Sequence, residues 1–198
     1  FGRTGPANAR NIGIEFSECR YIAFLDADDT WDPEYLETML NKIKHEKCYG
    51  VVSEAEYVSP KTTTKLHLPT NINYNLLLQT NPIPTAAVVL DRFLLTDPKF
   101  PTVGHEDYAL WLSLTKKYGP IICVNKKLVT INRIFGSLSS NKIRASQWHW
   151  NTLKLFSDKK FITRIILFII YAVNGRIKRS SKNYAPIILP NFITKILP

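Results

Sequence analysis

Three carboxylates, Asp26, Asp28 and Asp29, follow directly on an apolar run that begins at Ile22. An apolar run bounded by polar residues predicts a buried strand. In open α/β sheets, ligands bind beyond the carboxyl ends of such strands. Crowded carboxylates repel one another unless a cation joins them, and hard divalent ions such as Mg²⁺ prefer oxygen ligands. The cluster therefore predicts a metal-assisted phosphate site.

An ordinary solvated turn is the alternative interpretation of these acids. The turn would precede a helix with Asp32 as its N-cap and Pro33 at its first position. This accounts for Asp32, but it does not explain why the strand delivers Asp26 and Asp28 before the turn begins. From the cluster alone, both interpretations stay open.

A second pair of acids, Glu106 and Asp107, begins an apolar helical pattern that ends at Tyr118, before Gly119. Acids in the first turn of a helix are favoured by its dipole, which is a purely structural role. Displacement of a diphosphate from a sugar carbon by a hydroxyl group has two requirements, however. The departing diphosphate must be neutralised, and the incoming hydroxyl must lose its proton. A metal held by residues 26–29 and a carboxylate at 106 or 107 could share these tasks.

The elements that must position these acids alternate between helices and strands, which predicts α/β layering. We expect helices over residues 5–16, 33–47, 73–80 and 104–118, and strands over 20–25, 49–53, 85–90, 121–124 and 128–134. The Pro- and Thr-rich residues 59–70 predict a loop.

The composition fits one domain, or one domain with an appendage. The chain has 198 residues, of which 45% are hydrophobic, so it can build a core and is not a disordered chain. Cys19, Cys48 and Cys123 form no CxxC pair, which predicts buried free thiols in a reducing compartment and no structural zinc. The first residues show no signal-peptide pattern, and an initiating Met is absent, so we expect a fragment.

The formal net charge of +10 is unevenly distributed along the chain. Residues 1–107 carry 10 basic and 15 acidic side chains, whereas residues 108–198 carry 16 basic side chains and one acid, Asp158. The first part can hold a metal, and the second attracts anions. The basic part contains no nucleic-acid motif, and anionic lipid explains its charge equally well, so we expect no nucleic-acid partner.

Nine apolar residues, 165–173, form the centre of the tail. They are too few to span a bilayer, which takes about 20. Basic residues stand on both sides of them: Lys159, Lys160 and Arg164 before, and Arg176, Lys178, Arg179 and Lys182 after. This pattern is typical of a helix that lies on an anionic membrane surface. A helix buried against the domain is the alternative.

Four motifs follow one another in a fixed order. They read Gly5-x-Ala7-x-Ala9-Arg10-Asn11-x-Gly13, Tyr21-Ile22-Ala23-Phe24-Leu25-Asp26-Ala27-Asp28-Asp29-x-Trp31-x-Pro33, Glu106-Asp107-Tyr108-x-Leu110-Trp111-Leu112 and Gly136-Ser137-Leu138-Ser139. This set resembles the central signature of family 2 glycosyltransferases over residues 5–140. The resemblance implies a GT-A-like (Rossmann-like) α/β fold with a mixed sheet flanked by helices. We expect a partial GT-A domain over residues 1–140 and a helical, basic tail over residues 141–198.

The resemblance also implies an inverting transferase that uses a nucleotide-sugar donor and Mg²⁺ or Mn²⁺. Asp26 and Asp28 match the family's DxD motif, and Asp28 is the leading metal ligand. Asp29 adjoins them and would contact donor or acceptor. Arg10 matches an arginine near the donor side.

The second acidic motif would supply the proton transfer. By resemblance, Asp107 matches the catalytic base, and Glu106 would orient it or bind acceptor hydroxyls. Trp111 in the same motif is expected in the core, and His105 is not expected to be a ligand.

The chain departs from the family pattern at its beginning. Family members start with a strand, a nucleotide-binding loop and an acidic segment that holds the base and ribose, and nothing here corresponds to them. We therefore expect a truncated gene product or fragment whose donor binding is weakened.

The expected function is sugar transfer to a glycan or lipid-linked glycan in surface polysaccharide biosynthesis, by a cytoplasmic protein peripheral on the inner face of the cell membrane. The alternative is a catalytically incomplete remnant or a membrane-associated interaction module.

Overall fold

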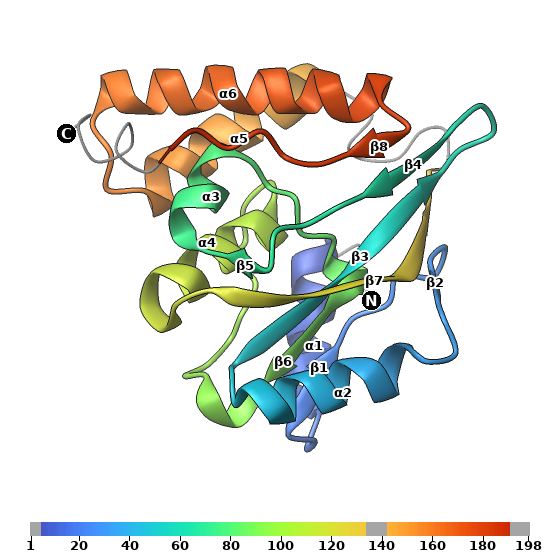
Figure 1. The fold of residues 1–198 in the computed structure, drawn as a ribbon. Coiled ribbons are helices and arrows are strands. Elements are labelled where there is room, and N and C mark those ends of the chain that lie inside the picture. The colour runs from blue at the N-terminus through green and yellow to red at the C-terminus, as the bar shows by residue number, and fades with distance from the viewer. Residues whose placement is uncertain (1–4, 134–141, 191–198) are drawn as a thin grey trace.

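Strand β3 (Gly50–Val58) is the centre of a mixed sheet in the computed structural model, which describes residues 5–133 and 142–190 (Figure 1). Its first half pairs antiparallel with β6 (Val88–Asp91), and its second half pairs antiparallel with β4 (Thr63–Leu66). Along its length β3 also pairs in parallel with β7 (Ile121–Asn132), with register shifts around Glu54. The sheet is therefore mixed, as the sequence predicts.

Shorter strands extend this centre. β1 (Tyr21–Ala23) pairs antiparallel with β6, and β8 (Asn183–Tyr184) pairs in parallel with β4. β2 (Thr30–Trp31) and β5 (Asn71–Ile72) both pair antiparallel with β7. Because β1 is short, the chain reaches Asp26 and its neighbours just beyond the strand end.

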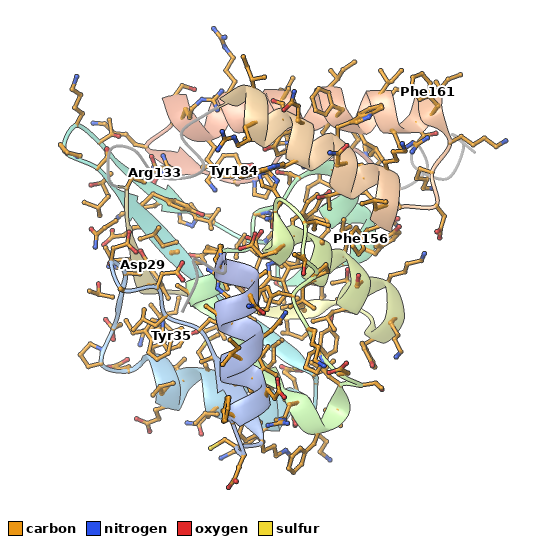
Figure 2. The ribbon with its side chains drawn as sticks, turned by 180° about the vertical axis from the view of Figure 1, so that it is seen from behind. Asp29, Tyr35, Arg133, Phe156, Phe161 and Tyr184 are labelled. Carbon is orange, nitrogen blue, oxygen red and sulfur yellow. The ribbon has the colours of Figure 1, made fainter. Side chains whose placement is uncertain are left out.

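Helices cover the sheet. They are α1 (Pro6–Phe16), α2 (Tyr35–Glu46), α3 (Tyr74–Gln79), α4 (Glu106–Tyr118), α5 (Lys142–Phe156) and α6 (Phe161–Ser180), with 3₁₀ turns η1 (Thr85–Ala87) and η2 (Arg92–Leu94). Figure 1 shows α2 at one end of the molecule and α5 and α6 side by side at the other. Figure 2, from behind, shows α1 in front of the sheet and α4 beside it.

The core lies between the sheet and these helices. α2 buries one stripe, Tyr35, Met39 and Ile43, because residues at this spacing share a helix face. Full burial of a side chain such as Met39 contributes about 1.5–3 kcal/mol. Trp111 in α4 is fully buried, which confirms its predicted place in the core.

Several predicted strand boundaries were wrong. The strand predicted over 20–25 has only residues 21–23, and the one over 85–90 begins with the turn η1. The strands over 121–124 and 128–134 are one strand, β7, because β3 supplies a continuous partner across the polar residues between them. For the same reason the predicted loop over 59–70 contains β4, which completes a hairpin with β3.

The helix predicted over 33–47 begins later, at Tyr35, with Glu34 as its N-cap. Asp32 is therefore not the N-cap. Its Oδ1 accepts a hydrogen bond from the Glu34 backbone N–H at 3.0 Å, and its carbonyl accepts one from Tyr35. These bonds close a turn in front of the helix. The predicted short helix over 73–80 is confirmed as α3, capped by the Asn73 side chain.

The C-terminal helix combines the two interpretations of the tail. α6 buries Thr163, Leu167 and Asn174 against the domain, yet it leaves Ile162 and Ile169 exposed. Among the described residues, no helix is long and apolar enough to cross a membrane. The predicted boundary at residue 140 lies outside the described residues and stays a prediction.

The three cysteines are free, as predicted, but they are not all buried. Cys123 is buried in β7, Cys48 is intermediate and Cys19 is exposed after α1. Cys19 lies in a surface turn that the sheet does not cover, so the prediction of burial was wrong there.

Candidate functional site

Arg10 joins the two acidic motifs. Its Nη1 donates to Glu106 Oε1 at 2.8 Å, and its Nη2 donates to Asp26 Oδ1 at 2.9 Å and Oδ2 at 3.2 Å. The partners lie 96 and 16 residues away in sequence. Helix α1 presents the guanidinium between the end of β1 and the start of α4. The fold thereby brings together two motifs that the sequence could only pair as a hypothesis.

Asn11, next to Arg10, fixes this arrangement. Its side chain donates to the carbonyl of Phe100 at 2.9 Å and accepts from the N–H of the same residue at 2.7 Å. The Phe100 ring in turn lies edge-on to Phe24, with centroids 5.1 Å apart, and the Arg10 guanidinium lies 5.4 Å from its centroid. This clamp holds α1 to the segment that leads into α4.

Burial and charge pairing act in opposite directions on the pKa values of Arg10 and Glu106. Burial alone would lower the pKa of Arg10, but the hydrogen bond and charge of Asp26, with Glu106 and Asp107 beyond, raise it overall. Burial and the neighbouring Asp107 raise the pKa of Glu106, although Arg10 opposes the shift. Arg10 is therefore a fixed cation, and Glu106 is a carboxylate that needs it.

Asn132, at the end of β7, holds the rest of the first acidic cluster. Its backbone N–H donates to Asp29 Oδ1 at 3.1 Å, and its side-chain amide donates to the carbonyl of Asp28 at 2.6 Å. Burial raises the pKa of Asp29 to about 6, together with the charges of Asp28 and Asp26 and against the bond from Asn132. Figure 2 labels Asp29 close to β7, on the opposite side of the molecule from Phe161.

Asp107 lies half-buried in the first turn of α4. Its Oδ1 accepts from the backbone N–H of Tyr108 at 2.7 Å, and its Oδ2 accepts a long hydrogen bond from the Asn81 amide at 3.5 Å. His105 precedes the helix in a left-handed conformation, with φ of 60°. Burial lowers the pKa of His105, although Asp107 opposes the shift, so the ring is a neutral neighbour. The Asp107 carboxylate is thus held by the Tyr108 backbone and the Asn81 side chain.

The acids do not form a ready-made metal cage. Within residues 5–133 and 142–190, no group of three His, Cys, Asp or Glu side chains is placed to hold an ion. Asp28 is exposed, however, and its carboxylate accepts no hydrogen bond from any described residue. Mg²⁺ is commonly held by one or two carboxylates together with substrate phosphates. The exposed oxygens of Asp28 fit that arrangement, whereas both oxygens of Asp26 already accept from Arg10.

The structure thus brings Arg10, Asp26 and Glu106 into direct contact, with Asp107 next to Glu106 and Asp28 next to the bridge in sequence. The metal and catalytic roles of these residues stay predictions. Sequence reasoning missed the structural roles of Asn11, Asn81 and Asn132. Asn11 stood inside a quoted motif, but the two others carry no sequence signal. The predicted Ser-rich motif at 136–139 lies outside the described residues.

Comparison with known proteins gives consistent matches. Residues 2–95 match the model of Glycosyl transferase family 2. The chain is 36% identical over 179 residues to UDP-Glc:alpha-D-GlcNAc-diphosphoundecaprenol beta-1,3-glucosyltransferase WfaP of Escherichia coli, covering 88% of this chain and 69% of that protein. It is 29% identical to the putative teichuronic acid biosynthesis glycosyltransferase TuaG of Bacillus subtilis, covering 89% of this chain and 71% of that protein.

The fold also matches solved structures. Residues 1–349 of Staphylococcus aureus TarS, in complex with UDP-GlcNAc, superpose with a TM-score of 0.60 at 14% identity. The match covers 87% of this chain, and the chain spans about half of that structure, 53% of its length. At this identity the likeness shows the fold alone, and it confirms the GT-A-like mixed sheet that the sequence predicted.

Proposed function

This chain belongs to glycosyltransferase family 2, and on that premise we propose that it transfers a sugar from a nucleotide-sugar donor to a lipid-linked glycan in surface polysaccharide biosynthesis. The contact of Arg10 with both Asp26 and Glu106 carries the proposal, because it joins a donor-side acid to the acids that would serve the acceptor. The WfaP relative is named as a glucosyltransferase that uses UDP-Glc and GlcNAc-diphosphoundecaprenol, and TarS has been solved in complex with UDP-GlcNAc.

The proposed chemistry is a single displacement with inversion at the sugar carbon. Asp107 takes the proton from the acceptor hydroxyl as its oxygen attacks that carbon, and the nucleotide diphosphate leaves from the opposite face. Glu106, fixed by Arg10, positions the turn that carries Asp107.

On the donor side, the negative charge of the leaving diphosphate must be neutralised. Asp28 would hold Mg²⁺ or Mn²⁺ here, beside Asp26, whose oxygens accept from Arg10, and the ion would neutralise that charge when bound. Asp29 lies in the same turn. Its pKa is raised to about 6, which is still below neutral pH, so the carboxyl group is mostly ionised there. Its place beside Asp28 suits contact with donor or acceptor hydroxyls.

Transfer assays with Asp107→Asn test the proposed base. UDP-Glc and UDP-GlcNAc would serve as donors, and α-GlcNAc-diphosphoundecaprenol in detergent would serve as acceptor. We expect loss of at least about 100-fold in turnover with an unchanged melting temperature, because the amide keeps the shape but cannot take a proton. Asp97→Asn, an exposed acid elsewhere, is the matched control. Full turnover in Asp107→Asn would remove this residue as the base.

We also place the protein peripherally on the inner face of the cytoplasmic membrane. The exposed side chains Phe161, Ile162, Ile169 and Val173 of α6 support this location. Basic residues at both ends of the helix suit an anionic lipid surface. Cosedimentation with vesicles containing anionic lipid, lost in high salt, would be the expected result, and the same binding to neutral vesicles would contradict the role of charge.

A further inference from the structure

An open groove lies between α5 and α6. Its volume is about 970 Å³, and residues of one face of α5, Ile143, Gln147 and Trp150, line it with Phe168 of α6. The Trp150 ring meets the edges of Phe161 and Phe168, with centroids 5.9 and 5.8 Å apart. The walls therefore combine aromatic and aliphatic side chains with the polar Ser146, Gln147 and Asn151.

Apolar side chains are also exposed on α6. Phe161, Ile165 and Ile169 are spaced four residues apart, so they share a helix face. Their exposed fractions are 59%, 38% and 56%, which leaves a stripe of apolar surface that begins at Phe161, the ring that contacts Trp150 in the groove wall. An elongated apolar ligand would bury this stripe together with the groove wall.

Trp148 connects the groove to the proposed catalytic end. Its indole packs so closely on Gly104 that a Cβ at that position would overlap it. It also meets the ring of His105 edge-on, with centroids 5.7 Å apart. Gly104 and His105 directly precede Glu106 and Asp107 in the chain. The groove therefore begins within one side chain of the segment that carries the proposed base.

A cationic side chain also lies near Trp148. The guanidinium of Arg144 lies 6.0 Å from the centroid of the Trp148 ring. Arg144 and the groove thus both adjoin Trp148, which packs on the two residues before Glu106 and Asp107. The acceptor named for the WfaP relative consists of a sugar, a diphosphate and a lipid chain, so a carboxylate, a cation and an apolar groove in one region suit its three parts.

We propose that this groove binds the isoprenoid chain of a lipid diphosphate-linked sugar acceptor. Arg144 lies beside the diphosphate, and the sugar hydroxyl faces Asp107. This inference rests on the proposed function and adds where the lipid part of the acceptor binds. The groove selects lipid-linked acceptors over water-soluble sugars because only the lipid covers its aromatic walls.

Equilibrium binding to two probes with the same head group tests the proposal. The probes are α-GlcNAc-diphosphate esterified with an 11-carbon alkyl chain and the same compound with a methyl group, both kept below micelle formation. We expect the long-chain probe to bind at least about tenfold more tightly, because each buried methylene adds affinity. Ile143→Asp, at a side chain 75% exposed and therefore safe for folding, should remove this preference. Trp150→Ala provides a second groove variant.

The matched control is Leu36→Asp, at an exposed apolar residue of α2 at the other end of the molecule. It should leave binding of both probes unchanged. Equal binding of the two probes, or a chain-length preference that both groove variants retain, would overturn the groove assignment. In that case transfer to the methyl probe would show that the proposed function stands without it.

Two other outcomes also count against the proposal. If neither probe binds or accepts sugar, the acceptor class is wrong, and the proposed function fails together with the groove. If Ile143→Asp weakens binding to anionic vesicles as much as binding to the long-chain probe, the groove serves as a membrane contact and not as an acceptor site.

Discussion

The Arg10 bridge makes one prediction that can be worked out from its geometry. Arg10→Ala removes three charge-assisted hydrogen bonds, and it leaves Glu106 beside Asp107 without a cation. Hydrogen bonds to charged groups are worth about 1.5–3 kcal/mol net, and breaking a fully buried ion pair costs about 3–5 kcal/mol.

Exposure decides where the loss falls within that range. The Glu106 side chain is 16% exposed, so its contact counts nearly in full, whereas Asp26 is 48% exposed and water screens its contact. We therefore expect Arg10→Ala to lower the free energy of unfolding by about 2–3 kcal/mol. Arg10→Lys should lower the free energy of unfolding by less than Arg10→Ala does, because one ammonium group reaches one of the two acids but not both.

Urea unfolding followed by circular dichroism measures this loss, and a double-mutant cycle with Glu106→Gln assigns it. We expect a coupling energy of about 1–2 kcal/mol, since the two residues contact each other directly. Arg20→Ala is the matched control, because Arg20 pairs with Asp91 at 2.8 Å away from the site. It should lower stability without coupling to Glu106.

Additivity of Arg10→Ala and Glu106→Gln, within about 0.5 kcal/mol, would refute the bridge as an energetic unit. The same reasoning requires a functional effect. Arg10→Ala should reduce transfer at least about tenfold when the protein is assayed well below its unfolding temperature, since a 1.4 kcal/mol loss of positioning already gives that factor. Unchanged transfer would show that the bridge stabilises the fold only.

Three further predictions concern the metal, the pH dependence and the packing of α5. Asp28→Ala should abolish Mn²⁺-dependent binding of UDP in calorimetry, as chelator should in the parent protein, and binding that survives both treatments would exclude a metal at this residue. Burial raises the pKa of Asp29 in the folded chain to about 6, above the ordinary value of 3.8, so the protonated form favours folding and stability should fall as pH rises from about 4 to about 6. Because water screens this partly exposed carboxylate, the loss of stability should be only about 1 kcal/mol. In urea unfolding with chelator present, Asp29→Asn should no longer show the fall in midpoint with pH. If the variant and the parent protein show the same dependence on pH, the raised pKa of Asp29 is contradicted. Gly104→Ala should lower the melting temperature and displace α5, because the added Cβ overlaps Trp148. The free energy of unfolding should fall by about 1–3 kcal/mol. An unchanged melting temperature would mean that the indole moves freely.

Most of the helices and strands could be predicted from local features of the sequence. Residue types and their order placed acids after a buried strand and at the start of a helix, because apolar periodicity and helix-end preferences are local properties. The core position of Trp111 and the short helix capped by Asn73 followed from the same local rules. The first two of the ordered motifs lie within residues 2–95, the part of the chain that matches the family model.

Only the tertiary structure decided which of these residues meet. Nothing local predicts that Arg10 reaches Glu106, 96 residues away, or that Asn132 holds Asp28 and Asp29. β7 is one strand because β3 pairs with it across polar residues that would interrupt an isolated pattern. α6 both packs on the domain and exposes an apolar stripe, because burial depends on what lies opposite each face. Long-range pairing sets these contacts, and it is a property of the folded chain and not of any segment.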